Sequence, residues 1–148
     1  NAEELFLKNG VHPKRSDYIF ASTGSLGCGL PLAVGYALAG NLTYVCMSDG
    51  ELYEGSMWEA FEIISKKNLT NLKMCLIFNG YSAYDETNLD AIVNKLRAFG
   101  MGVIIVDNNM QEIIPALELH TEIPVVIIVK ASSDFKGYKG LQCHYQTL

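Results

Sequence analysis

The chain has 148 residues, of which 49% are hydrophobic and 18% are charged, and its formal net charge at pH 7 is -5. A chain of this length and composition can bury a sizeable core, which excludes a disordered or fibrous protein. The acidic balance and the shortness of its basic clusters, such as Lys66 with Lys67, argue against nucleic-acid binding. The longest apolar run, residues 124–129, is too short to span a membrane, and no signal-peptide pattern opens the chain. We therefore expect a cytoplasmic protein without membrane contact.

Short β-branched runs alternate with longer helical patterns from residue 43 onward. An earlier helix is expected near Gly29, because apolar residues recur at helical spacing after a glycine-rich turn. The expected strands cover residues 43–47, 73–78, 102–106 and 124–130. The expected helices between them cover residues 55–67, 88–99 and 110–120.

This alternation defines the predicted architecture. Strands that are joined by helices of about 10 to 15 residues pair in parallel, and near-continuous apolar strands are typical of sheets that are covered on both faces. We predict one α/β domain over residues 1–148, with a doubly wound, mostly parallel sheet and helices on both faces.

The four cysteines are Cys28, Cys46, Cys75 and Cys143, and they show no C-x-x-C spacing. The spacing indicates neither a zinc site nor a redox pair. Cys46 and Cys75 lie inside apolar strand-like runs, so we expect them to be small hydrophobic core residues.

Polar residues follow two successive strands at the point where ligands bind in open parallel sheets. Asp49 precedes Gly50 after the first strand, and Asn79 precedes Gly80 after the second. A carboxylate and an amide oxygen suit Mg²⁺, with the carbonyl group of Tyr81 as a further possible ligand and a diphosphate to complete the shell. Alternatively, the D-G and N-G pairs are only turn formers.

The surrounding sequence resembles a known family. Asp49 and Asn79 lie thirty residues apart with a glycine after each, which resembles the thiamine-diphosphate signature of transketolases. The segment SDGELYEGSMWEA is similar to the transketolase form of this motif. The earlier segment STGSLGCGLPLAVGYALA resembles the family's glycine turn and the helix that begins after this turn. The resemblance continues through NLTNLKMCLIFNGY and KLRAFGMGVIIVD to the terminal CHYQTL, and so covers roughly residues 10–148.

The resemblance implies a set of ligand-binding residues. Asp49, Asn79 and the Tyr81 carbonyl would hold Mg²⁺, or Ca²⁺ or Mn²⁺ in its place. The residues that it places against thiamine diphosphate are Gly24, Ser25, Leu26, Gly50, Glu51, Asn79 and Tyr81.

Three further residues match positions that act in the family. Glu54 resembles a glutamate of a carboxylate network between subunits, although a carboxylate at a helix N-terminus is also favoured by the helix dipole alone. His12, in GVHPK, resembles a histidine that faces the substrate, and His144 resembles one near the diphosphate. Either histidine could instead be an ordinary surface residue.

The resemblance also implies a partner. The glutamate that activates the cofactor ring belongs, in the family, to a separate pyrimidine-binding domain, for which this chain is too short. We therefore expect a subunit of a homo- or hetero-oligomer that transfers two-carbon ketol units between small sugar-type substrates only with a pyrimidine-domain partner. Two alternative functions stay open: a different thiamine-diphosphate carboligase, and a non-catalytic module for assembly or regulation. Cys28, where the family more often has glutamine or histidine, puts the substrate in doubt.

Overall fold

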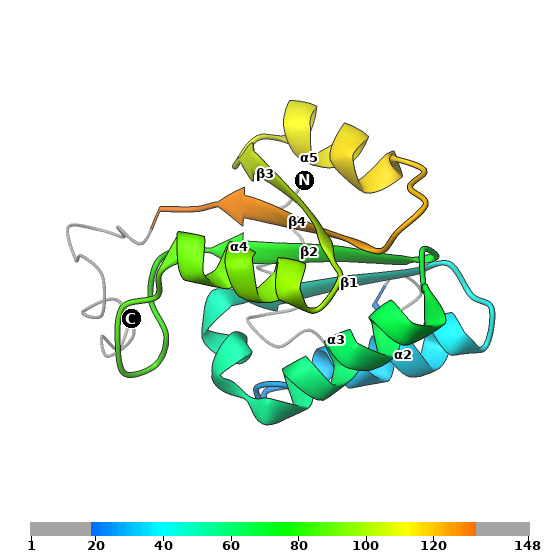
Figure 1. Cartoon of the computed structure of the whole chain (residues 1–148). Helices are drawn as coiled ribbons and strands as arrows, with labels where there is room; N and C mark the ends of the chain where they lie inside the picture. The colour runs from blue at the N-terminus through cyan, green and yellow to red at the C-terminus, as the bar shows by residue number, and fades with distance from the viewer. Residues whose placement is uncertain (1–18, 133–148) are drawn as a thin grey trace.

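The computed structural model describes residues 19–132, which form a single α/β unit (Figure 1). Its helices and strands alternate along the chain as predicted. The helices are α2 (Gly29–Leu38), the short 3-10 helix η1 (Asp49–Tyr53), α3 (Gly55–Lys67), α4 (Leu89–Ala98) and α5 (Met110–Glu118). The strands are β1 (Thr43–Ser48), β2 (Leu72–Phe78), β3 (Gly102–Asp107) and β4 (Val125–Lys130).

The four strands form one sheet in the order β1-β2-β4-β3, and every neighbouring pair is parallel. The predicted fold class is therefore confirmed. β1 and β2 are direct neighbours, and their register pairs Ser48 with Ile77. The residues that follow these two strands consequently lie side by side at the carboxyl edge of the sheet.

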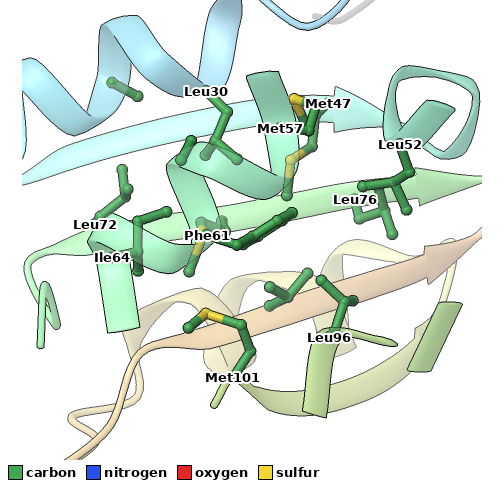
Figure 2. Close-up of a cluster of buried hydrophobic side chains, with 14 of the residues drawn as sticks. Leu30, Met47, Leu52, Met57, Phe61, Ile64, Leu72, Leu76, Leu96 and Met101 are labelled. Carbon is green, nitrogen blue, oxygen red and sulfur yellow. The ribbon is translucent and has the colours of Figure 1, made fainter. Parts of the chain in front are cut away.

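Helices cover both faces of the sheet, with α5 on one side and α2, α3 and α4 on the other (Figure 1). The larger core lies under the three helices, and its side chains come from helices and strands alike (Figure 2). Phe61 and Ile64 of α3 and Leu96 of α4 are fully buried there. In the central strand β4 alternate side chains enter opposite cores: Ile128 faces the three helices and Ile127 faces α5.

The edge strand β1 is covered on one face only. Met47 is buried under the helices, whereas Tyr44 and Cys46, on the opposite face, are exposed. α5 packs against β2, β3 and β4, so this part of the sheet lies beyond its cover. The prediction that Cys46 belongs to the core is therefore wrong, while Cys75 of β2 is half-buried.

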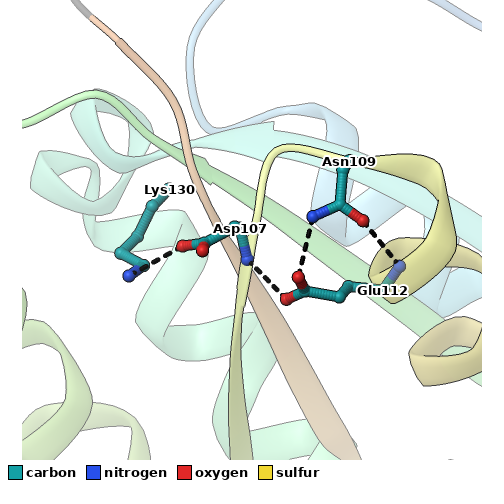
Figure 3. Close-up of polar contacts among 4 residues, drawn as sticks. All are labelled: Asp107, Asn109, Glu112 and Lys130. Carbon is teal, nitrogen blue, oxygen red and sulfur yellow. Dashed lines mark hydrogen bonds and ion pairs between the residues drawn. The ribbon is translucent and has the colours of Figure 1, made fainter.

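A side-chain cap fixes where α5 begins. The Asn109 side chain accepts a hydrogen bond from the backbone N–H of Glu112 at the start of α5 (3.0 Å). In return the Glu112 carboxylate accepts bonds from the Asn109 amide (2.7 Å) and from the N–H of Asp107 (3.0 Å) (Figure 3). Asp107 also pairs with Lys130 of β4 (2.8 Å), which joins the ends of β3 and β4 (Figure 3).

The described part of the chain contains no helix that is both long and apolar enough to cross a membrane.

Candidate functional site

The Asp49 carboxylate is the most completely buried polar group at the carboxyl edge of the sheet. Its side chain is 0% exposed. Oδ2 accepts hydrogen bonds from the backbone N–H of Gly80 (3.0 Å) and from the hydroxyl group of Thr87. Oδ1 has no hydrogen-bond partner and is itself buried. A buried carboxylate oxygen without a partner is costly to the fold, and a bound cation or water could satisfy it.

The turn after β2 brings Asn79 and Gly80 beside this carboxylate. Gly80 has a φ of +85°, which lets its N–H face Asp49 where a larger residue would be strained. The Asn79 side-chain oxygen accepts a bond from the N–H of Tyr81 (2.9 Å), and this bond keeps it within the turn. The carbonyl oxygen of Gly80 accepts a hydrogen bond from the backbone N–H of Thr87 (2.8 Å). This bond closes the loop of residues 80–87 and brings Thr87 back to Asp49.

The backbone of the loop after Asn79 passes close to Gly50. A β carbon added at Gly50 would lie 3.3 Å from Cα of Ser82 and 3.7 Å from the carbonyl oxygen of Tyr81. The predicted oxygen ligands Asp49 and Tyr81 are thus on touching segments. Gly50 allows this approach because it has no side chain.

Glu51 connects three segments around the site. Its carboxylate accepts a hydrogen bond from the N–H of Gly27 (3.1 Å) and a longer one from the N–H of Ser48 (3.4 Å), as the N3 residue of a capping box at η1. In this structure the carboxylate therefore holds the glycine turn against β1. Its predicted contact with a diphosphate stays a prediction.

The predicted wall residues Gly24, Ser25 and Leu26 are exposed on the turn before α2. The turn is held by the start of α3, where the Ser56 hydroxyl donates to the carbonyl of Gly27 (2.8 Å). Gly27 has a φ of +76°, and a β carbon there would lie 2.6 Å from the β carbon of Glu54. The turn is therefore fixed beside the site, whereas its contact with the cofactor stays a prediction.

The three remaining candidates are Glu54, His12 and His144. Glu54 is exposed at the N-cap of α3 and makes no side-chain cap hydrogen bond, so it is available to a partner or to water. His12 and His144 lie outside the described residues, and their roles stay predictions.

The arrangement fits a hard divalent cation. Asp49 offers a buried anionic oxygen without a partner, and the neutral oxygens of Asn79 and Tyr81 belong to the adjoining turn. Mg²⁺ is typically bound by one or two protein oxygens together with phosphate oxygens and water. Residues 19–132 hold no cluster of three or more His, Cys, Asp or Glu side chains that could bind a metal on its own. A single carboxylate with neutral oxygens leaves coordination positions that phosphate oxygens and water can fill.

Sequence reasoning missed Thr87 and the Gly27 contact with α3. Thr87 precedes the N-cap residue Asn88 and looks like part of that cap; only the closed loop reveals that its hydroxyl serves Asp49. For Gly27, the positive φ could have been suspected from the glycine-rich turn, but the contact with Glu54 joins segments that are distant in sequence.

Comparisons with known proteins agree with this fold. Human transketolase is 35% identical in an alignment of 137 residues, and the match covers 84% of this chain and 21% of that protein. The 6-deoxy-6-sulfo-D-fructose transketolase subunit SqwG of Clostridium sp. (strain MSTE9) is 37% identical in an alignment of 131 residues, and the match covers 80% of this chain and 47% of the subunit. The transketolase structure from Campylobacter jejuni superposes with a TM-score of 0.62 at 25% identity, over 76% of this chain and 21% of that one. No family model matches the chain.

The fold and the site define an α/β domain that presents oxygen ligands at the carboxyl edge of a parallel sheet. Its relatives in sequence and structure are transketolases. The chain belongs to the transketolase family and spans about a fifth of the full-length transketolases, or under half of the SqwG subunit.

Proposed function

We propose that this chain is the magnesium- and diphosphate-binding part of a transketolase-like enzyme that transfers two-carbon ketol units between sugar-type substrates. The observation that carries the proposal is the buried, unpartnered Oδ1 of Asp49 beside the Asn79 turn. Asp49, Asn79 and the Tyr81 carbonyl would hold Mg²⁺, with Ca²⁺ or Mn²⁺ as substitutes. The metal would then be linked to the diphosphate of thiamine diphosphate.

The chain's own residues position the cofactor. Thr87 and Gly80 hold Oδ2 of Asp49, so that Oδ1 is the oxygen left to the metal. Gly50 leaves space for the loop that carries the Tyr81 carbonyl, and Glu51 fixes the glycine turn that would flank the cofactor rings. Bound thiamine diphosphate supplies the carbanion chemistry of the reaction.

A partner chain completes the proposed enzyme. Thiamine diphosphate requires a carboxylate on its aminopyrimidine ring, and we propose that a pyrimidine-domain chain provides it. Two relatives are named as single subunits of a transketolase. One is SqwG, and the other belongs to the apulose-4-phosphate transketolase of Actinobacillus succinogenes and is 38% identical over 109 residues. Their names support a divided enzyme that acts on a sugar derivative. Glu54, exposed at the start of α3, is a candidate for the contact with the partner chain.

Isothermal titration calorimetry with thiamine diphosphate tests the metal and cofactor site. The full chain is titrated with and without Mg²⁺, alone and with the pyrimidine-domain partner. We expect binding heat only with Mg²⁺, at highest affinity with the partner, and a loss of binding of at least about 10-fold in Asp49→Asn, since one ligand charge is removed. Asp90→Asn, an exposed carboxylate in the first turn of α4, is the matched control and should bind like the parent.

The outcomes separate the candidate functions. Equal heats for the parent chain and Asp49→Asn would overturn the site assignment. Magnesium-dependent binding without ketol transfer in the presence of the partner would favour a non-catalytic module. Transfer of a different carbon unit would identify another thiamine-diphosphate carboligase.

A further inference from the structure

Two cysteines face one another across the first two strands of the sheet. The register of the parallel ladder pairs Cys46 of β1 with Cys75 of β2. Directly paired residues point to the same face of a sheet, so both thiols project from one side. Cys75 packs beside Ile127 and Val129 on the face that α5 covers, and Cys46 extends that row to the edge.

The two thiols differ in their access to solvent. Cys46 is exposed and lines a groove of about 660 Å³ along β1, together with Tyr44 and Glu51. Cys75 is half-buried behind it, between β1 and the part of the sheet under α5. A small reagent therefore reaches Cys46 first, and Cys75 is the nearest thiol on the neighbouring strand.

Their protonation also differs. A hydrogen bond from the Cys75 thiol lowers the pKa of Cys46 to about 7, although partial desolvation of the thiol within the groove and the negative charge of Glu51 act in the opposite direction. The same hydrogen bond, together with burial, raises the pKa of Cys75. Cys46 is thus the nucleophilic thiolate near neutral pH, and Cys75 keeps its proton.

We propose that Cys46 and Cys75 form a thiol–disulfide exchange site for low-molecular-weight disulfides, with Cys46 as the attacking and Cys75 as the resolving cysteine. The Cys46 thiolate attacks one sulfur of the disulfide; the disulfide bond breaks, and the released thiolate takes up the proton that Cys46 lost. Cys75 then gives up its proton and attacks the Cys46 sulfur, and a second thiol leaves. The two cysteines are oxidised by two electrons and the small disulfide is reduced to two thiols.

The distance between neighbouring strands permits the bond. Neighbouring strands lie about 4.8 Å apart, which is within the range of about 4.4 to 6.8 Å between the Cα atoms of a disulfide. The bond would link the two strands that precede Asp49 and Asn79, but the exchange itself requires neither metal nor cofactor.

The experiment uses the full chain with Cys28→Ser and Cys143→Ser, so that Cys46 and Cys75 are the remaining cysteines. The chain is equilibrated with mixtures of oxidised and reduced glutathione, blocked with an alkylating reagent and analysed by intact mass and non-reducing peptide mapping. We expect one internal Cys46–Cys75 disulfide. Cys75→Ser and, as a second replacement, Cys75→Ala should instead accumulate a stable glutathione adduct on Cys46.

Alkylation rates provide a readout that does not depend on a variant. In the unaltered chain at about pH 7, Cys46 should react about fivefold faster with iodoacetamide than the exposed Cys28. The hydrogen bond from Cys75 favours the Cys46 thiolate, and this gain outweighs the lower nucleophilicity that accompanies a lower pKa. The proposal is overturned if glutathione disulfide leaves both thiols free. It is equally overturned if Cys46 forms the same stable adduct with and without Cys75, or reacts no faster than Cys28.

Discussion

The Thr87 hydroxyl group donates a hydrogen bond to Oδ2 of Asp49, across a separation of 38 residues in sequence. This oxygen also accepts the N–H of Gly80, whereas Oδ1 of the same carboxylate is buried without a partner. Thr87 therefore holds the loop after β2 closed and determines which carboxylate oxygen is left for a ligand.

Thr87→Val removes this hydroxyl group while it keeps the shape of the side chain. We expect the free energy of unfolding to fall by about 1.5 to 3 kcal/mol, because a hydrogen bond to a buried charged group is lost. Urea unfolding at neutral pH, followed by the fluorescence of the single tryptophan, Trp58, measures the change. Thr87→Ser keeps the hydroxyl group and should recover most of the loss. A Thr87→Val chain that is as stable as the parent would show that the hydrogen bond to Asp49 contributes nothing to stability.

Asp49→Asn should separate stability from ligand binding. Without metal, the variant should be more stable than the parent by on the order of 1 kcal/mol, because the unpaired buried charge is gone while an amide oxygen can still accept from Thr87 and Gly80. With Mg²⁺ and thiamine diphosphate the order should reverse, since the parent gains about 2.7 kcal/mol at a ligand concentration 100-fold above its dissociation constant and the weaker-binding variant gains less.

Thermal unfolding of both chains, with and without the two ligands, checks this reversal. Asp90→Asn is again the control, because this carboxylate is exposed on α4. A metal-free Asp49→Asn chain that is less stable than the parent would show that the carboxylate has a purely structural role.

Sequence reasoning predicted the elements well because each leaves a local pattern. The observed bounds of α3 coincide with the segment of helical periodicity in the sequence. Asn68 is the C-cap residue of this helix and has the left-handed conformation (φ 47°). β4 is almost continuously apolar because it lies in the middle of the sheet between two covered faces. The single turn of η1 was not predicted, because five residues are too few to show a period.

The candidate site was predictable only in part. The positions of Asp49 and Asn79 follow from where two parallel strands end, which the sequence shows directly. The exposure of Cys46 depends on β1 being the edge strand, and its pairing with Cys75 depends on the register between two strands. Neither relationship has a local signal, and cysteine spacing along the chain cannot reveal it.

Gly27→Ala tests how the glycine turn is held beside the site. The new β carbon would lie 2.6 Å from both the Glu54 β carbon and the Ser56 hydroxyl oxygen, at a φ of +76° that only glycine adopts without strain. We expect a loss of more than about 1 kcal/mol in unfolding free energy, measured with urea. Gly29→Ala is the matched control: a β carbon there meets nothing within 4 Å, and the change in α2 should be neutral or stabilising by up to about 1 kcal/mol. Similar losses at both glycines would contradict the role assigned to the turn.

The carboxylate of Glu112 should make the cap of α5 sensitive to acid. Hydrogen bonds from the Asn109 side chain and from the backbone of Asp107 lower the pKa of Glu112 below its ordinary value of 4.5. A carboxyl group whose pKa is lower in the folded state stabilises the fold above its unfolded pKa and loses this contribution as the pH falls through the folded value. The stability difference between the parent and Glu112→Gln should therefore be constant from about pH 7 to about pH 5.5 and shrink below about pH 4.5.

Urea midpoints across this pH range measure the loss of the Glu112 contribution. Glu118→Gln, at the other end of α5, is the control, because it removes a carboxylate of the same helix without touching the cap. Asn109→Ala should destabilise the chain at neutral pH by about 0.5 to 2 kcal/mol and also reduce the pH dependence, because it removes the donor that holds the Glu112 carboxylate. An Asn109→Ala chain that kept the parent's full pH dependence would leave the Asp107 N–H as the effective partner of Glu112.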